Sequence, residues 1–259
     1  MKKKILTTLA LVVCAVALVI GSVAGTLAYL RVSVYVTNTF TYGKVAITLD
    51  ESAVDEYGHK TQTGTRVIGN RYKLFPGTTY DKDPVIHVDP STEDMFLFLK
   101  VDNGIAGLAL TPEDASRLNC KTIHQQLLDN GWKVYTNEAG DTYRKFTESA
   151  VGTFTLQFSS TVYYYSVGAA EDQTDFKIVT KAMGDIATFT TFTITDNQLV
   201  ANEETLTAYV QHQSTVTVTA YAIQTVGEGI SGDLHQAAAK FAAEFESARI
   251  PAATPPATP

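Results

Sequence analysis

Apolar and polar side chains alternate along much of this 259-residue chain, the pattern of half-buried β-strands. The clearest case is residues 214–224, in which Val216 and Val218 alternate with Thr217 and Thr219. Residues 95–99 are continuously apolar, which indicates a strand buried on both faces. Further strands are predicted at 45–50, 85–89, 154–158, 162–167, 176–178 and 186–195.

Two of these predictions are specific. Ser159-Ser160-Thr161 interrupts the apolar pattern, so 154–158 and 162–167 read as the two arms of a hairpin. Phe189 and Phe192 have opposite parity within 186–195, which predicts a β-bulge near Thr190.

Helix signals are confined to the middle and the end of the chain. Thr111 precedes a proline and two acids, and Thr122 stands three residues before Gln125, as in a capping box. Asp233 would cap a last helix with an apolar stripe. With residues 1–28 and the tail set aside, the chain suits one large all-β domain or two small ones, with short helices inserted.

The first 28 residues have the form of a leader. Lys2, Lys3 and Lys4 are followed by 5–30, which contains no charged residue. Small side chains at the end of this run predict cleavage by a signal peptidase between Ala28 and Tyr29. The run is also long enough to cross a bilayer, so an uncleaved anchor is the alternative. Both interpretations place the rest of the chain outside the cytoplasm.

Cleavage after Ala28 would leave a strand-forming sequence at the new N-terminus. Its apolar side chains all have one parity, which puts them on one face of a strand: Leu30, Val32, Val34 and Val36. Such a terminus can act as a donor strand that pairs with an open sheet edge on another copy of the chain. It can also fold back as the first strand of its own sheet, and the sequence leaves both open.

Composition narrows the classes of partner. The formal charge is −7, and removing the three leader lysines takes it to −10. An acidic chain is a poor match for nucleic-acid phosphates and for anionic lipid headgroups. Cys14 lies in the leader, so Cys120 would be the one thiol of the exported chain, with no intramolecular disulfide.

No catalytic, cofactor-binding or metal-binding residue is predicted. Zinc peptidases place two histidines on one helix face with a glutamate between them. No such spacing occurs among His59, His87, His124, His212 and His235. Cys120 and His124 are four residues apart, but a helix start with two unrelated side chains explains them better than a nucleophile and its base.

Several segments, in order along the chain, resemble the TasA/camelysin family of exported proteins from Gram-positive bacteria. They are Gly25-Thr26-Leu27-Ala28-Tyr29, Asn38-Thr39-Phe40-Thr41-Tyr42-Gly43, Lys73-Leu74-Phe75-Pro76-Gly77, Lys82-Asp83-Pro84, residues 95–103, Asn130-Gly131-Trp132, and Val218-Thr219-Ala220-Tyr221-Ala222-Ile223-Gln224. The chain departs from the family after the cut. The family usually has an acidic, Ser/Thr-rich segment there, whereas residues 30–36 are markedly apolar.

The resemblance implies an all-β fold, a jelly-roll-like antiparallel β-sandwich with short helical inserts, and the residues themselves add the C-terminal helix. The expected organisation is a signal peptide at 1–28, a single domain at 29–249 and a Pro-rich flexible tail at 250–259, which is read from its composition and is not a family feature. The expected function is a secreted subunit of biofilm-matrix fibres that self-associates by donor-strand exchange. The expected partners are a signal peptidase of the SipW type and other matrix proteins, with no nucleic acid.

Two alternatives remain at this point. The camelysin branch of the family implies a cell-surface metallopeptidase, although this chain lacks the zinc-peptidase spacing. An adhesin or glycan-binding module could use the polar loop 51–69 and the tyrosines Tyr163, Tyr164 and Tyr165.

Overall fold

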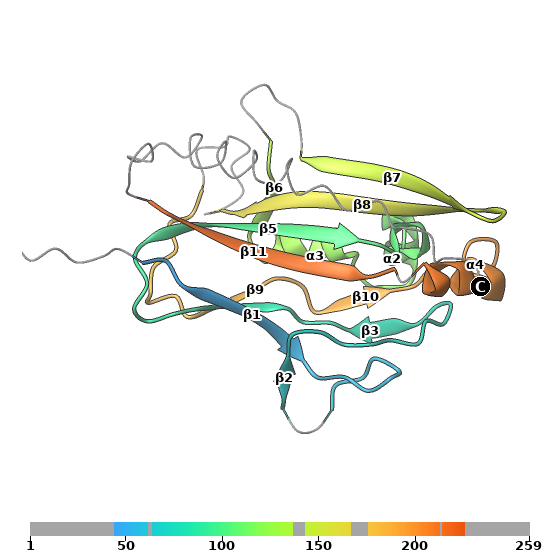
Figure 1. The fold of residues 1–259 in the computed structure, drawn as a ribbon, viewed down its shortest axis with the longest axis horizontal. Helices are drawn as coiled ribbons and strands as arrows, with labels where there is room; N and C mark the ends of the chain where they lie inside the picture. Colours follow the sequence, from blue (N-terminus) through green and yellow to red (C-terminus); the bar gives the residue numbers. More distant parts are fainter. Residues whose placement is uncertain (1–43, 62–63, 137–142, 167–175, 213, 226–259) are drawn as a thin grey trace, which may run out of the picture. The chain divides into compact units, whose positions relative to one another are not determined.

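The computed structural model describes residues 44–61, 64–136, 143–166, 176–212 and 214–225, all within one compact unit that spans 43–259 (Figure 1). The predicted cleavage site and donor strand lie outside these residues, as do the C-terminal helix from Asp233 and the tail. The described residues therefore contain the candidate acceptor of a donor strand, and not the donor.

Antiparallel strands make up most of the described chain. The smaller layer is a four-stranded sheet in the order β2 (Arg66–Val67), β1 (Ile47–Ser52), β4 (Val85–Val88) and β9 (Asp185–Ala187). The larger sheet has the order β11 (Val216–Gln224), β5 (Met95–Asn103) and β8 (Phe154–Tyr165), with β6 (Trp132–Val134) and β7 (Arg144–Val151) both paired to β8. A separate ribbon joins β3 (Thr79–Asp81) to β10 (Thr191–Thr193).

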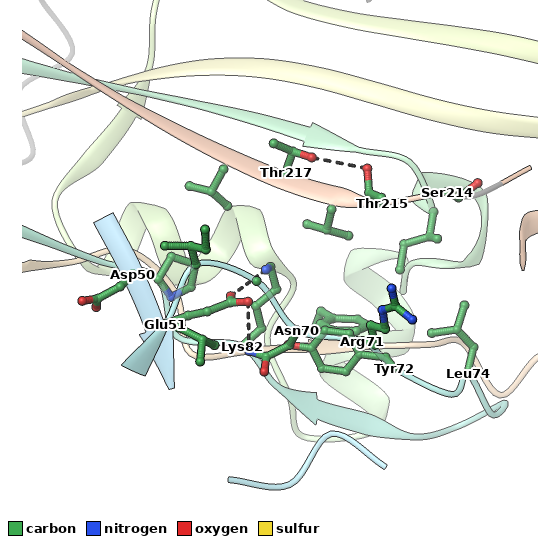
Figure 2. A pocket seen from close by; sticks show the side chains of 18 of the residues that line it. Asp50, Glu51, Asn70, Arg71, Tyr72, Leu74, Lys82, Ser214, Thr215 and Thr217 are labelled. Atoms are coloured by element: carbon green, nitrogen blue, oxygen red, sulfur yellow. Dashed lines mark hydrogen bonds and ion pairs between the residues drawn. The ribbon is translucent and has the colours of Figure 1, made fainter. Parts of the chain in front are cut away.

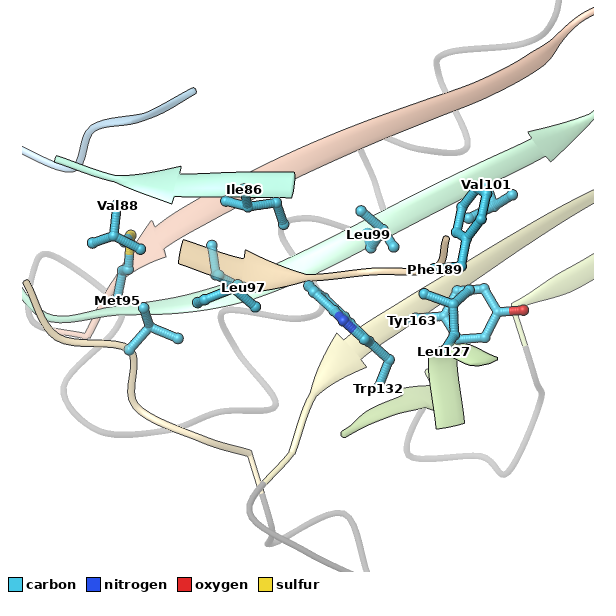
Figure 3. Packing of buried hydrophobic residues seen from close by; sticks show 12 residues of the cluster. Ile86, Val88, Met95, Leu97, Leu99, Val101, Leu127, Trp132, Tyr163 and Phe189 are labelled. Carbon is cyan, nitrogen blue, oxygen red and sulfur yellow. The ribbon is translucent and has the colours of Figure 1, made fainter. Parts of the chain in front are cut away.

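The two larger sheets pack face to face, as Figure 3 shows. Met95, Leu97 and Leu99 of β5 point into the interface and meet Ile86 of β4. Trp132 is fully buried there, and its indole N–H donates to the Ala187 carbonyl at 2.9 Å. The prediction of an all-β antiparallel sandwich with short helical inserts is confirmed.

The other face of β5 is buried as well. Phe96 and Phe98 belong to an aromatic cluster with Tyr164 and Phe176, whose rings stack at 4.3 Å between centroids. The interpretation of 95–99 as a strand buried on both faces is therefore confirmed. Such a strand reads as a continuous apolar run because neither face meets water.

Four short helical segments lie between strands: η1 (Ala106–Leu108), α2 (Pro112–Arg117), α3 (Ile123–Asp129) and α4 (Glu203–Gln211). The predicted caps of α2 and α3 are present. Thr122 Oγ1 accepts from the Gln125 amide at 3.1 Å, and Gln125 Oε1 accepts from the Thr122 amide at 2.9 Å. The sequence predictions did not include α4.

The predicted hairpin at Ser159-Ser160-Thr161 is wrong. These residues lie inside the continuous strand β8, where they pair with the end of β5. The hairpin partner of β8 is β7, and the turn contains Gly152 with φ of +62°. The sequence of β7 is largely polar because most of its side chains are exposed, so it lacks the apolar signal of a buried strand.

The predicted single strand at 186–195 is also wrong. The chain leaves β9 and enters β10 in a different sheet, and residues 188–190 form the break instead of a bulge. Gln126 of α3 holds this break, since its Oε1 accepts from the Thr190 and Thr191 amides at 2.9 and 3.2 Å. A contact to a helix 64 residues away leaves no trace in the local pattern.

Candidate functional site

The end strand of the larger sheet, β11, has one open backbone edge. The Thr215 carbonyl accepts from the Gly104 amide at 2.7 Å, and the Thr225 amide donates to the Asp94 carbonyl at 3.0 Å. Odd-numbered residues of β11 therefore bond to β5, and even-numbered residues point their N–H and C=O groups the other way. Within the described chain, no backbone group pairs with these outward groups at Val216 or Val218.

A groove of about 870 Å³ runs beside this edge. Residues 214–218 and the end of α4 form one side. Residues 49–51 of β1 and the segment 67–72 form the other, together with Leu74, Lys82 and Pro84. In Figure 2, β11 with Thr215 and Thr217 lies on one side of the groove, and Glu51, Asn70 and Tyr72 lie on the other side.

The groove has apolar side chains on both walls. Val216 and Val218 are half-buried, and both pack against core clusters of the sandwich. Leu74 lies on the opposite wall, while Ile68 and Val210 expose 97% and 61% of their surface at the same groove. Apolar surface next to an unpaired strand edge is the combination that an added strand can cover.

A buried ion pair stiffens the wall opposite β11. Lys82 Nζ lies 2.7 Å from Glu51 Oε2, and both side chains are less than 10% exposed. Asn70 donates to the other Glu51 oxygen and to the Ser52 carbonyl, both at 2.9 Å. Because these groups are satisfied by one another, the wall presents a fixed surface instead of free charge.

Tyr72 anchors the same wall to the core. Its hydroxyl donates to the Asp81 carbonyl at 3.1 Å, and its ring packs edge-on against Tyr80 and Phe192. Burial, with help from the nearby Glu51 carboxylate, raises the pKa of Tyr72 far above its usual value. The phenol therefore stays neutral and keeps its donor hydrogen.

A second cluster of charged side chains lies across the strands of the smaller sheet. His87 of β4 bridges Asp50 at 2.8 Å and Asp185 at 2.6 Å, and Arg66 also contacts Asp50. The hydrogen bonds to Asp50 and then to Asp185 raise the pKa of His87. Burial pushes the pKa of Asp50 upward, but the bonds from His87 and Arg66 outweigh it and lower that pKa.

The other residues weighed for chemistry are spread apart. His124 bonds the Tyr163 hydroxyl at 3.1 Å, His212 packs on Phe158, and Cys120 is a half-buried free thiol. In the described ranges no three His, Cys, Asp or Glu side chains group as metal ligands would. His235 lies outside those ranges, as do Ala28, Tyr29 and the donor residues Leu30, Val32, Val34 and Val36.

Sequence reasoning predicted β11 as a strand but did not identify its open edge or the groove. Alternation reports that a segment is a strand, whereas edge position depends on what lies beside it. Comparisons with protein-family models, curated proteins and solved structures find no match. Of the helices in the described residues, none is long and apolar enough to cross a membrane.

Proposed function

We propose that this protein is a secreted structural subunit of extracellular matrix fibres, assembled by strand donation. Residues 30–36 of one copy add to the open edge of β11 on the next copy. The observation that carries this proposal is the outer edge of β11, which no described backbone group pairs with and which lies beside a groove with apolar walls. In each contact, backbone hydrogen bonds provide affinity and alternate side chains provide register.

The length of the donor suits the acceptor. Seven extended residues span about 23 Å at about 3.3 Å each, and β11 is nine residues long. The donor therefore fits along the strand with room at either end.

The alternation of the donor also suits the groove. In β11, the side chains of Val216 and Val218 face the core, and those of Thr217 and Thr219 face away. A paired donor strand would place Val32 and Val34 on the core side. Arg31, Ser33 and Tyr35 would then stay on the outer face. A shift of one residue would bury the polar set, so the register is defined.

The deciding experiment compares the chain from Tyr29 with a chain that lacks 29–36, by electron microscopy and sedimentation. Fibres or concentration-dependent polymers are expected from the first and monomers from the second. Val34→Asp, on the apolar face, is expected to prevent assembly, while the matched variant Ser33→Asp retains it. Undiminished fibres from the deletion chain would remove the proposal.

A strand that folds back within its own copy is the competing outcome. Ten residues separate Val36 from β1, which allows at most about 35 Å of reach. Under this alternative the Tyr29 chain stays monomeric at high concentration. An added peptide with the sequence of residues 29–36 distinguishes the two, because it should cap the growing ends of fibres but have no acceptor on a self-paired monomer.

Export is tested by the N-terminal residue of the protein recovered from the culture medium. Tyr29 there supports cleavage by a signal peptidase, and the family resemblance implies one of the SipW type. An intact Met1 in the membrane fraction supports the anchor instead and would contradict a secreted fibre subunit.

A further inference from the structure

A second cavity lies far from the β11 edge in the sheet order, on the β7 side of the larger sheet. Its volume is about 300 Å³, at the lower end of the range for small-molecule sites. It is enclosed by β8 and β7 on one side and by η1 and α3 on the other, and Phe192 of β10 also lines it. The fibre proposal makes no use of this cavity.

The polar groups of the cavity converge on Arg144. Pairing in the sheet places Arg144 beside Thr161, and Thr161 beside Val101, so the three side chains share the inner face. The Arg144 guanidinium interacts with the Tyr163 hydroxyl, which also contacts His124 Nδ1 at 3.1 Å. Three hydrogen-bonding side chains thus meet at one end of the cavity.

The charged side chains that line this cavity are all basic. The chain carries a net charge of −7, yet no aspartate or glutamate lines the cavity. Lys121 at its rim is already paired with Asp129 at 2.7 Å. Among the described residues, Arg144 has no carboxylate within ion-pair distance, whereas Arg66 and Arg117 each have one. A half-buried guanidinium without an anion is costly, which favours an anionic ligand.

The remaining walls are apolar. Ile105, Leu110 and Phe192 are each less than 10% exposed and line the cavity with Ile123. We infer that this cavity binds a small organic monocarboxylate, with the carboxylate on Arg144 and the apolar body against Ile105 and Phe192. The planar guanidinium can bond both carboxylate oxygens. An inorganic ion could accept the same bonds but has no apolar body to contact Ile105 and Phe192, so it should bind more weakly.

Burial and the nearby charge of Arg144 lower the pKa of His124, so its ring is neutral at pH 7. A neutral ring can donate or accept toward the ligand without adding charge. The site therefore holds one net positive charge at its polar end, which matches a single carboxylate better than a dianion.

Calorimetric titration at pH 7 tests the inference on the protein as it is recovered from cells, with benzoate as the probe. Saturable binding is expected, with benzamide and inorganic phosphate at least tenfold weaker. No benzoate binding, or phosphate binding as tight as benzoate, would overturn the inference.

Two variants test whether Arg144 supplies the positive charge that binds the carboxylate. Arg144→Gln should weaken benzoate binding at least tenfold, and Arg71→Gln, at an exposed arginine outside this cavity, should leave it unchanged. Chemical-shift mapping on the unaltered protein gives an answer that does not depend on how a variant folds. Benzoate should shift the amide signals of Ser159, Thr161 and His124 and leave that of Val218 in place. The reverse pattern, or equal affinity in Arg144→Gln, would contradict the assignment.

Discussion

In the described part of the chain, the larger sheet ends at β11 on one side and at β6 and β7 on the other, and β11 and β7 differ in what lies beside them. On β7, the Tyr143 carbonyl accepts from the Val162 amide at 2.9 Å, which points the backbone groups of Phe146, Glu148 and Ala150 outward. Phe146 is 72% exposed, and the cavity that it lines has a polar end at Arg144 and His124. On β11, the outward groups face an apolar groove with a stiff second wall.

The comparison separates two requirements of strand addition. Among the described residues, no backbone group pairs with the outward N–H and C=O groups of either strand, so both could give backbone hydrogen bonds to an added strand. At β11, the alternate side chains of that strand could also be buried, because apolar surface lies on both sides of its groove. Burial of apolar area contributes more to association than an exchange of backbone bonds with water.

The largest expected effect comes from closing each edge in turn with proline. Ala220 and Ala150 are both alanines whose N–H points outward, so proline there removes no bond to the neighbouring strand. Ala220→Pro should abolish fibres as seen by electron microscopy, while Ala150→Pro leaves them intact. Ala220→Ser, which keeps the N–H, is the control. Equal loss of fibres from both proline variants would contradict the comparison.

The next effect concerns the wall opposite β11. Lys82→Met leaves the Glu51 carboxylate buried without its partner, and the expected cost is about 3–5 kcal/mol in the free energy of unfolding. Lys121→Met breaks the pair with Asp129, whose side chains are 62% and 52% exposed, and should cost at most about 1 kcal/mol. Urea unfolding measures both.

The double variant Glu51→Gln with Lys82→Met should recover much of the loss, since no buried charge remains. If Lys82→Met alone costs no more than Lys121→Met, the pair does not stiffen the groove.

The smallest effect is the pH dependence at His87, on the sheet that backs the groove. Because folding raises the pKa of His87, the contribution of His87 to stability is fully present below the unfolded-state pKa near 6.5. That contribution is lost as the pH rises through the folded-state pKa. The lowered pKa of Asp50 removes stability only at acid pH, as the pH falls through that pKa. The effect of His87 should be under about 1 kcal/mol, because its side chain is 30% exposed and that of Asp185 69%.

The measurement is the difference in thermal midpoint between the unaltered protein and His87→Gln from pH 5 to 9. The difference should be largest near pH 5–6 and shrink toward pH 9. The control is His59→Gln, at an exposed position. A constant difference across the range would show that His87 contributes packing and not charge.

Sequence reasoning succeeded where the causes are local. The caps at Thr111 and Thr122 join groups three residues apart, so the structure contains them as predicted. The strands around Val218 and Leu97 were found because one or both faces are buried. It failed at β7, whose side chains are mostly exposed, and at the break near Thr190, which Gln126 holds from a distant helix.

The features of the candidate site also divide into those that the sequence predicted and those that only the structure showed. By itself the sequence determined an all-β chain, and it predicts a leader with a cleavage site and an alternating segment suited to strand donation. Only the tertiary structure decided that β11 lies at the end of its sheet, that a groove accompanies it, and that Arg144 faces a cavity without a carboxylate. The physical reason is that every strand carries the same backbone donors and acceptors. Whether they stay unpaired depends on which neighbours the fold brings beside them.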